Sequence, residues 1–177
     1  MLDLGVIVAN FKFLVVQGLF GLGGFAGGTL RLAIPAIVLG FVLGIFIGLA
    51  RLARAPWLSV PATVYVEFFR GVPLVMVIFW IWFIIPQLLR FPIPEYGVAL
   101  TAFVIFEAAY FGEIVRAGIQ SVPRGQVEAA TAVGLTRAQT MRHVVLPQAL
   151  RNMVPSIVTQ MIVLFKDTSL ASIIGYV

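Results

Sequence analysis

An uncharged apolar run, LAIPAIVLGFVLGIFIGLA from Leu32 to Ala50, constrains the fold of this chain more than any other feature of its sequence. As an α-helix rising about 1.5 Å per residue, the run is long enough to cross the roughly 30 Å hydrocarbon core of a bilayer. The composition agrees, because 61% of the residues are hydrophobic and only 11% are charged, against about 25% charged in soluble domains. With a mean hydropathy of +1.08, the sequence predicts an integral membrane protein rather than a soluble domain with a very apolar core.

Three further apolar segments predict additional spans. They run from Pro61 to Pro86, from about Tyr96 to Gly118 and from about Met153 to Phe165. Gly71 and Pro73 lie inside the second segment, and we expect them to bend it. No alternating pattern is long enough for the strands of a membrane barrel. The predicted fold is therefore an all-α integral membrane protein, a bundle of helical spans.

Basic residues indicate which ends of the spans face the cytoplasm. Arg51 and Arg54 directly follow the first span. Others lie in or beside the segment that joins the third and fourth spans: Arg116, Arg124, Arg137, Arg142 and Arg151. Because cytoplasmic loops carry an excess of Lys and Arg, both regions are predicted to lie in the cytoplasm.

A glycine repeat marks one face of the first span. Gly40, Gly44 and Gly48 recur every four residues and therefore fall on the same side of the helix. Small residues there permit the close approach of another helix. The sequence leaves open whether that helix belongs to this chain or to a partner.

The first residues form a separate segment. Residues 1–28 are apolar but include Asn10, Lys12 and Gln17 and then many glycines. The segment is either a helix lying at the external interface or an extra span, and we favour the interfacial helix. Residues 29–177 form the predicted transmembrane domain.

The composition gives no support to several classes of function. The chain has no cysteine, so disulfides and thiol chemistry are absent, and its single histidine, His143, cannot build a haem or metal cluster alone. The net charge of +5 fits the cytoplasmic loops of a membrane protein better than nucleic-acid binding. The sequence contains no GxxxxGK[ST] phosphate loop. We therefore predict no catalytic residue, no metal and no bound cofactor in this chain.

The polar segment between the third and fourth spans, residues 119–148, is predicted to form two short helices. Residues 128–132 are a strong helix-forming run, and Gly134 ends it. Thr136 is placed to cap the second helix, with Gln139 three residues on as in a capping box. Pro147 is expected to end that helix.

Such a hairpin has two interpretations. A rigid knob with small residues on one helix and Glu128 for ion pairing would dock in a groove of another protein. A solvated connecting loop is the simpler alternative, but it leaves the length of the segment unexplained.

Glu128-Ala129-Ala130, then three residues, then Gly134, and finally Val145-Leu146-Pro147 resemble the EAA loop of ABC importer permeases. In that family the loop forms the coupling helix that seats in the ATP-binding subunit. The resemblance therefore implies these ATPase-coupling residues: Glu128, Ala129, Ala130, Gly134, Leu146 and Pro147.

The resemblance extends from Gly28 to the end of the sequence. The stretches YVEFFRGVPLVM, AAYFGEIVRAGIQSVPRGQ, LPQAL and LFKDTSLASIIG are similar to the polar amino acid branch of these permeases. Within that branch, PLVMVIFW, FEAAYF and TQMIVLFKDTSL most resemble glutamate/aspartate permeases. The family continues with a loop and a fifth span, which is missing after Val177, so we expect about four to five spans.

Membership of that family implies a set of partners. The chain would be a multi-pass permease subunit of the bacterial inner membrane, surrounded by lipid and paired with a second permease, the same or homologous. ATPase subunits would hold ATP and Mg on the cytoplasmic side. A periplasmic or extracytoplasmic solute-binding protein would deliver the amino acid. Transport would proceed by alternating access, with no hydrolysis on this chain.

Ionisable residues within spans are costly and are candidates for the translocation path. Glu67 and Arg70 stand three apart, so they either pair with each other or leave Arg70 free to bind a substrate carboxylate. Glu107 lies near the middle of the third span, where it would meet a substrate amino group or bond another helix. Glu113 and Arg116 are expected to form an ion pair at the base of the loop.

A polar break closes the fourth apolar segment, and it completes the candidates for the substrate path. An interrupted helix at this point would resemble the substrate sites of secondary transporters. The break consists of Lys166, Asp167, Thr168 and Ser169.

Three rival functions remain. A secondary amino acid carrier or channel, independent of an ATPase, explains the spans and buried charges but not the EAA loop. An intramembrane enzyme lacks a suitable set of catalytic residues. A non-transporting anchor for an ATPase needs the loop but no charged path.

Overall fold

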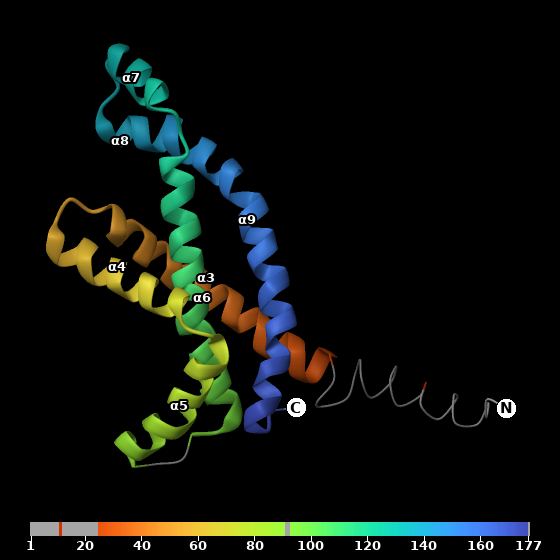
Figure 1. The fold of residues 1–177 in the computed structure, drawn as a ribbon. Coiled ribbons are helices and arrows are strands. Elements are labelled where there is room, and N and C mark those ends of the chain that lie inside the picture. The colour runs from red at the N-terminus through yellow and green to blue at the C-terminus, as the bar shows by residue number, and fades with distance from the viewer. Residues whose placement is uncertain (1–10, 12–24, 91–92, 177) are drawn as a thin grey trace. The chain divides into compact units, whose positions relative to one another are not determined.

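The computed structural model describes residue 11 and residues 25–90 and 93–176. The prediction for residues 1–28 therefore falls almost entirely outside the described residues. Every element in the described part is helical (Figure 1). In chain order the elements are η2 (Phe25–Thr29), α3 (Leu30–Leu52), α4 (Pro56–Gly71), α5 (Leu74–Leu89), α6 (Glu95–Gln120), α7 (Arg124–Ala132), α8 (Arg137–Thr140), η3 (Met141–Val145), α9 (Leu146–Asp167) and η4 (Thr168–Ile174).

Three helical stretches in the described residues are long and apolar enough to cross a membrane: Gly27–Leu52, Glu95–Gln120 and Arg137–Ile174. Helices α4 and α5 supply a fourth span if the pair counts as one broken span. The expected bend at Gly71 and Pro73 is confirmed as a break, because α4 ends at Gly71 and α5 begins after Pro73. Proline has no N–H to continue the hydrogen-bond ladder. The all-α membrane fold is confirmed.

The chain divides into two compact units. The described part of the first combines residues up to Gly40, residues 72–107 and residues 162–176. Here α5 packs against η4, and the Tyr176 hydroxyl donates a hydrogen bond of 3.0 Å to the Gly28 carbonyl. Buried side chains from α3, α5, α6, α9 and η4 form its interior: Leu32, Val77, Ile78, Val98, Phe103, Leu164 and Ala171.

The second unit comprises Phe41–Gly71 and Ala108–Met161. In it α3 and α6 touch backbone to backbone. A Cβ added to Gly44 would lie 2.6 Å from the Phe111 Cβ, and one added to Gly48 would lie 2.6 Å from the Gly112 carbonyl oxygen. The glycine face is thus confirmed as a helix contact, and its partner at these two positions is α6 of the same chain.

The prediction that Pro147 ends the second loop helix is wrong. Helix α8 passes through the π-helical turn η3 into α9, which begins at Leu146 and runs to Asp167. Pro147 lies in the first turn of α9, where a missing N–H is tolerated. The preceding π turn has its own hydrogen-bond pattern, in which the Leu146 N–H donates to the Met141 carbonyl. The predicted fourth span, Met153 to Phe165, is part of this longer helix.

Candidate functional site

The polar segment folds as the predicted helix–glycine–helix hairpin. Helices α7 and α8 lie side by side beyond the end of α6 (Figure 1). Gly134 adopts φ +83°, a left-handed conformation that favours glycine. The Gly134 N–H donates to the Thr131 carbonyl at 3.0 Å, and the Leu135 N–H to the Ala130 carbonyl at 3.1 Å. This pair of bonds is a Schellman motif, which satisfies the last carbonyls of α7.

The predicted capping box of the second helix is also confirmed. The Gln139 N–H donates to the Thr136 hydroxyl at 3.4 Å, and the Thr136 N–H donates to the Gln139 side-chain oxygen at 2.9 Å. These reciprocal bonds satisfy donors that a helix start leaves free. Together with the Schellman motif, they fix the turn between α7 and α8 by local chemistry.

Replacing Gly134 with alanine is expected to destabilise the hairpin by about 1 kcal/mol, because an alanine Cβ disfavours the left-handed conformation. The matched control is Gly125→Ala, since Gly125 lies inside α7 and an added Cβ would meet nothing within 4 Å. Alanine there should be neutral or stabilising. Hydrogen exchange of the loop amides would measure both. Equal protection in the two variants would contradict the expectation.

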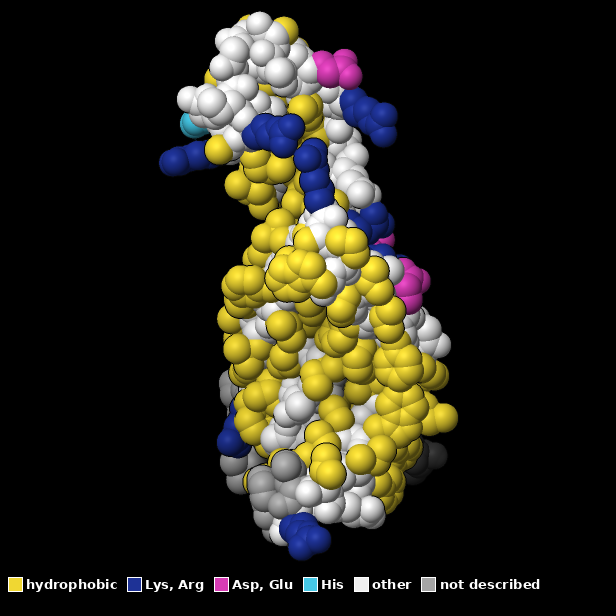
Figure 2. Space-filling model, turned by 90° about the vertical axis from the view of Figure 1, so that its left-hand side faces the viewer, with side chains coloured by type: hydrophobic (Ala, Val, Ile, Leu, Met, Phe, Trp, Pro, Cys, Tyr) yellow, Lys and Arg dark blue, Asp and Glu magenta, His cyan; other side chains and the backbone are white. Residues whose placement is uncertain are grey.

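The structure distributes the residues of the EAA pattern between a surface and a packed interior. Glu128 and Ala129 are exposed on α7, whereas Ala130 is buried. Leu146 and Pro147 are exposed at the start of α9. Basic side chains gather beside the hairpin, and hydrophobic side chains cover much of the face that Figure 2 shows. The hairpin thus presents one acidic residue and small side chains on a mainly basic element.

A cluster of five charged side chains holds α3, α4 and α6 together in the second unit. Glu113 is its centre, because its carboxylate accepts a hydrogen bond from Arg51 and two hydrogen bonds from Arg116. The two bonds from Arg116 are 2.5 and 3.0 Å long. Arg70 lies 3.8 Å from the same carboxylate, and Arg51 also bonds Glu67 at 3.1 Å. The cluster contains three arginines and two glutamates, so it keeps one net positive charge.

The ion pairs in this cluster differ in part from the predicted ones. The Glu113–Arg116 pair is confirmed, but Glu67 and Arg70 do not pair with each other, which was one of the two alternatives. Each of the two instead pairs with a residue of another helix, because α3 and α6 bring Arg51 and Glu113 against α4. Three-residue spacing shows only that two side chains share a helical face. Sequence reasoning assigned Arg51 only to membrane orientation and missed its role as a buried link.

Arg70 is the most accessible arginine of the cluster. Its side chain is 41% exposed, against 9% for Arg51 and 26% for Arg116. Its guanidinium lies 5.7 Å from the centre of the Tyr110 ring, within the range of a cation–π contact. The position leaves part of its hydrogen-bonding capacity open to solvent or to a ligand.

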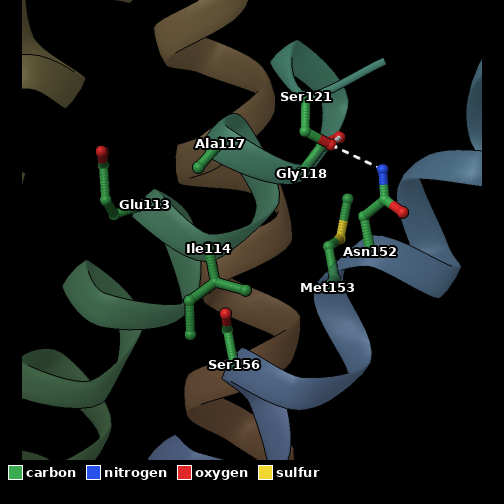
Figure 3. A pocket seen from close by; sticks show the side chains of 8 residues that line it. All are labelled: Glu113, Ile114, Ala117, Gly118, Ser121, Asn152, Met153 and Ser156. Atoms are coloured by element: carbon green, nitrogen blue, oxygen red, sulfur yellow. Dashed lines mark hydrogen bonds between the residues drawn. The ribbon is translucent and has the colours of Figure 1, made fainter.

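A cavity of about 240 Å³ lies beside this cluster, between α6 and α9 (Figure 3). Polar groups contribute to its wall: the Asn152 side-chain amide donates to the Ser121 hydroxyl at 2.8 Å, and Ser121 donates to the Gly118 carbonyl at 2.7 Å. Ser156 and Glu113 line it as well. The sequence did not predict this cavity, because its wall depends on how α6 and α9 pack.

In the first unit, Glu107 is fully buried. The four residues of the predicted polar break lie where α9 ends at Asp167 and the 3₁₀-helix η4 begins at Thr168. The Thr168 hydroxyl donates to the Phe165 carbonyl at 2.7 Å, and the Ser169 hydroxyl to the Lys166 carbonyl at 2.9 Å. The helix therefore tightens at this point and is not interrupted. Both hydroxyls bond to the preceding turn.

In the part of the chain that the structure describes, no group of three histidine or acidic residues could hold a metal ion.

Comparison with known proteins gives one family. Residues 36–176 match the family described as the inner membrane component of binding-protein-dependent transport systems. The glutamate/aspartate import permease protein GltK of Escherichia coli O6:H1 is 44% identical over 154 residues, which cover 83% of this chain and 69% of that protein. The probable glutamine ABC transporter permease protein GlnP of Bacillus subtilis is 45% identical over 147 residues, covering 83% and 67%.

A solved structure agrees with the fold. The crystal structure of an amino acid ABC transporter with histidines has a TM-score of 0.85 and 33% identity to this chain. The match covers 99% of this chain and 78% of the other.

Proposed function

Since this chain belongs to the inner membrane components of binding-protein-dependent transport systems, we propose that it carries an acidic amino acid, glutamate or aspartate. The chain is a non-catalytic permease subunit of an ABC importer for polar amino acids in the inner membrane. The observation that carries the proposed substrate is the 44% identity to a glutamate/aspartate permease. Family membership also implies ATPase and binding-protein partners.

The α7–α8 hairpin is the proposed docking element for the ATPase, which would hold ATP and Mg. Exposed Glu128 and Ala129 would face the partner, and Gly134 would set the turn. Leu146 and Pro147, exposed at the start of α9, would complete the surface. Movement of the ATPase subunits would reach the spans through α6 and α9, which precede and follow the hairpin in the chain.

The translocation path is proposed to lie between this subunit and a second permease, with a solute-binding protein delivering the amino acid from outside. Arg70, accessible at the rim of the arginine cluster, would bind a substrate carboxylate as a bidentate fork. Glu107, which is fully buried in the first unit, is a separate candidate for meeting the substrate amino group, and Glu67 would position Arg51 within the cluster. The four residues of the α9–η4 transition, Lys166 to Ser169, would supply further polar groups.

The test is ATP-dependent uptake of labelled glutamate into vesicles that contain the chain, its partner permease, its co-encoded ATPase and its binding protein. Glu128→Lys is expected to weaken ATPase association by about tenfold and to reduce uptake accordingly, because it reverses an exposed charge on the docking surface. Competition by other unlabelled amino acids would define the substrate.

The matched control is Glu95→Lys, the same charge reversal at an exposed position at the start of α6. It should leave association intact. Uptake that persists without the ATPase, unaffected by Glu128→Lys, would restore the alternative of a secondary carrier. Uptake that unlabelled glutamate and aspartate fail to inhibit would overturn the substrate assignment.

A further inference from the structure

The hairpin contains a cavity of its own, separate from the surface that carries Glu128. Its volume is about 550 Å³. The wall is mostly apolar and comes from α6, α7, the turn and η3: Ile119, Val127, Leu135, Met141 and Val145. Sites that bind a ligand or an anchoring side chain combine apolar walls with a few polar groups. This cavity has that composition and is therefore a candidate binding site.

One of those polar groups is Thr140, which is only 4% exposed and lines the cavity. Among the described residues its hydroxyl oxygen has no hydrogen-bond partner. Its backbone N–H is already used, since it donates to the Thr136 carbonyl at 2.8 Å. A buried hydroxyl without a partner costs free energy, and such groups are rare in native structures. The cavity therefore contains a hydroxyl oxygen, that of Thr140, which can form a hydrogen bond with a bound partner.

Thr131 lines the same cavity but is different in this respect. Its hydroxyl donates to the Val127 carbonyl within α7 at 2.8 Å. Two threonines thus face one cavity, one satisfied by its own helix and one not. Helical geometry alone does not explain the difference, because a threonine in a helix has a carbonyl four residues earlier within reach.

The mouth of the cavity has the composition of a protein interface. Val127 and Met141 line it and are 39% and 45% exposed. Arg137 lines it too and is exposed at the start of α8. Apolar walls inside a charged rim are typical of sites that bind an anchoring side chain from another protein. An acidic group nearby in the partner would complement the charge of this arginine.

We propose that this cavity receives a tyrosine side chain of the ATPase subunit, whose hydroxyl bonds Thr140 and whose neighbouring carboxylate pairs with Arg137. An aromatic ring is larger than an aliphatic side chain and fills more of an apolar cavity. Tyrosine also has a hydroxyl at the end of its ring that can form a hydrogen bond. The inference rests on the proposed docking of the hairpin on an ATPase. In this arrangement each protein inserts a part into the other: the hairpin docks on the ATPase, and a side chain of the ATPase enters the cavity of the hairpin.

The decisive variant is Thr140→Val, which removes the hydroxyl and keeps the shape. Binding between the reconstituted full chain and its co-encoded ATPase, measured by biolayer interferometry, is expected to weaken by about fivefold to tenfold, the loss of one hydrogen bond with its partner left unpaired. The isolated chain should melt at the same or a higher temperature, because an unpaired buried hydroxyl has been removed. Opposite signs for stability and association distinguish a partner site from a folding defect.

Thr131→Val is the matched control and should leave association unchanged, since its hydroxyl is satisfied within α7. Val127→Trp, which fills the cavity from its exposed rim, should weaken association more than tenfold. Unchanged binding of Thr140→Val, or equal weakening by both threonine variants, would overturn the tyrosine site while leaving the docking of the hairpin intact. A wild-type chain that fails to bind the ATPase would overturn both.

A small-molecule probe tests the chemistry without the ATPase. 4-Methylphenol, the small-molecule analogue of the tyrosine side chain, should raise the melting temperature of the isolated chain, and toluene should raise it less. The advantage of the phenol should disappear in Thr140→Val. Equal effects of the two probes on the wild-type chain would contradict a hydroxyl-directed site.

Discussion

Glu113→Gln is expected to destabilise the subunit by about 3 kcal/mol, because it leaves Arg51 buried beside a neutral amide. Glu113 is the one carboxylate in the described residues that contacts three arginines: Arg51, Arg70 and Arg116. The corresponding fall in the melting temperature is roughly 6–12 °C for a chain of this size. Thermal denaturation of the detergent-solubilised protein, followed by size-exclusion chromatography, measures it.

Glu67→Gln is the matched control, since it makes the same chemical change in the same cluster. The Glu67 side chain is 67% exposed and pairs only with Arg51 among the described residues. Exposed ion pairs contribute about 1 kcal/mol or less. A melting temperature that falls equally in the two variants would show that Glu113 is not the centre of the network.

Gly48→Ala is the second change with a large expected effect, about 2–3 kcal/mol of destabilisation. The new Cβ would lie 2.6 Å from the Gly112 carbonyl oxygen and 2.9 Å from the Val115 side chain. A backbone oxygen has no rotamer with which to move away, so α3 and α6 must separate. The higher helix propensity of alanine offsets only about 1 kcal/mol. The melting temperature in detergent again gives the measurement.

Alanine substitutions at two other glycines should have smaller effects on stability and provide the comparison. At Gly71 an added Cβ meets nothing within 4 Å, so Gly71→Ala should be neutral or slightly stabilising. At Gly118 the three nearest atoms all belong to the flexible side chain of Met153, which should give an intermediate loss. A Gly48→Ala protein as stable as the Gly71→Ala protein would mean that α3 and α6 are not in close contact.

Local chemistry explains why parts of the candidate site were predictable. The Gly134 turn and the capping box of Thr136 and Gln139 depend on atoms a few residues apart, so the sequence contains all of the interacting groups. The error at Pro147 has the same local scale. Pro147 follows a π turn and lies in the first turn of α9, where a missing N–H is tolerated, so it does not end the helix.

The sequence alone determined the membrane class, the positions of the spans, the break at Pro73 and the hairpin, because run length, hydropathy and capping are properties of consecutive residues. Only the tertiary structure decided which helix meets the glycine face and that Glu113 is the carboxylate shared by Arg51, Arg70 and Arg116. It also decided that the Thr140 hydroxyl is buried in a cavity without a hydrogen-bond partner among the described residues. Each of these depends on side chains far apart in sequence. Periodicity gives the face of a helix but not the neighbour that packs against it.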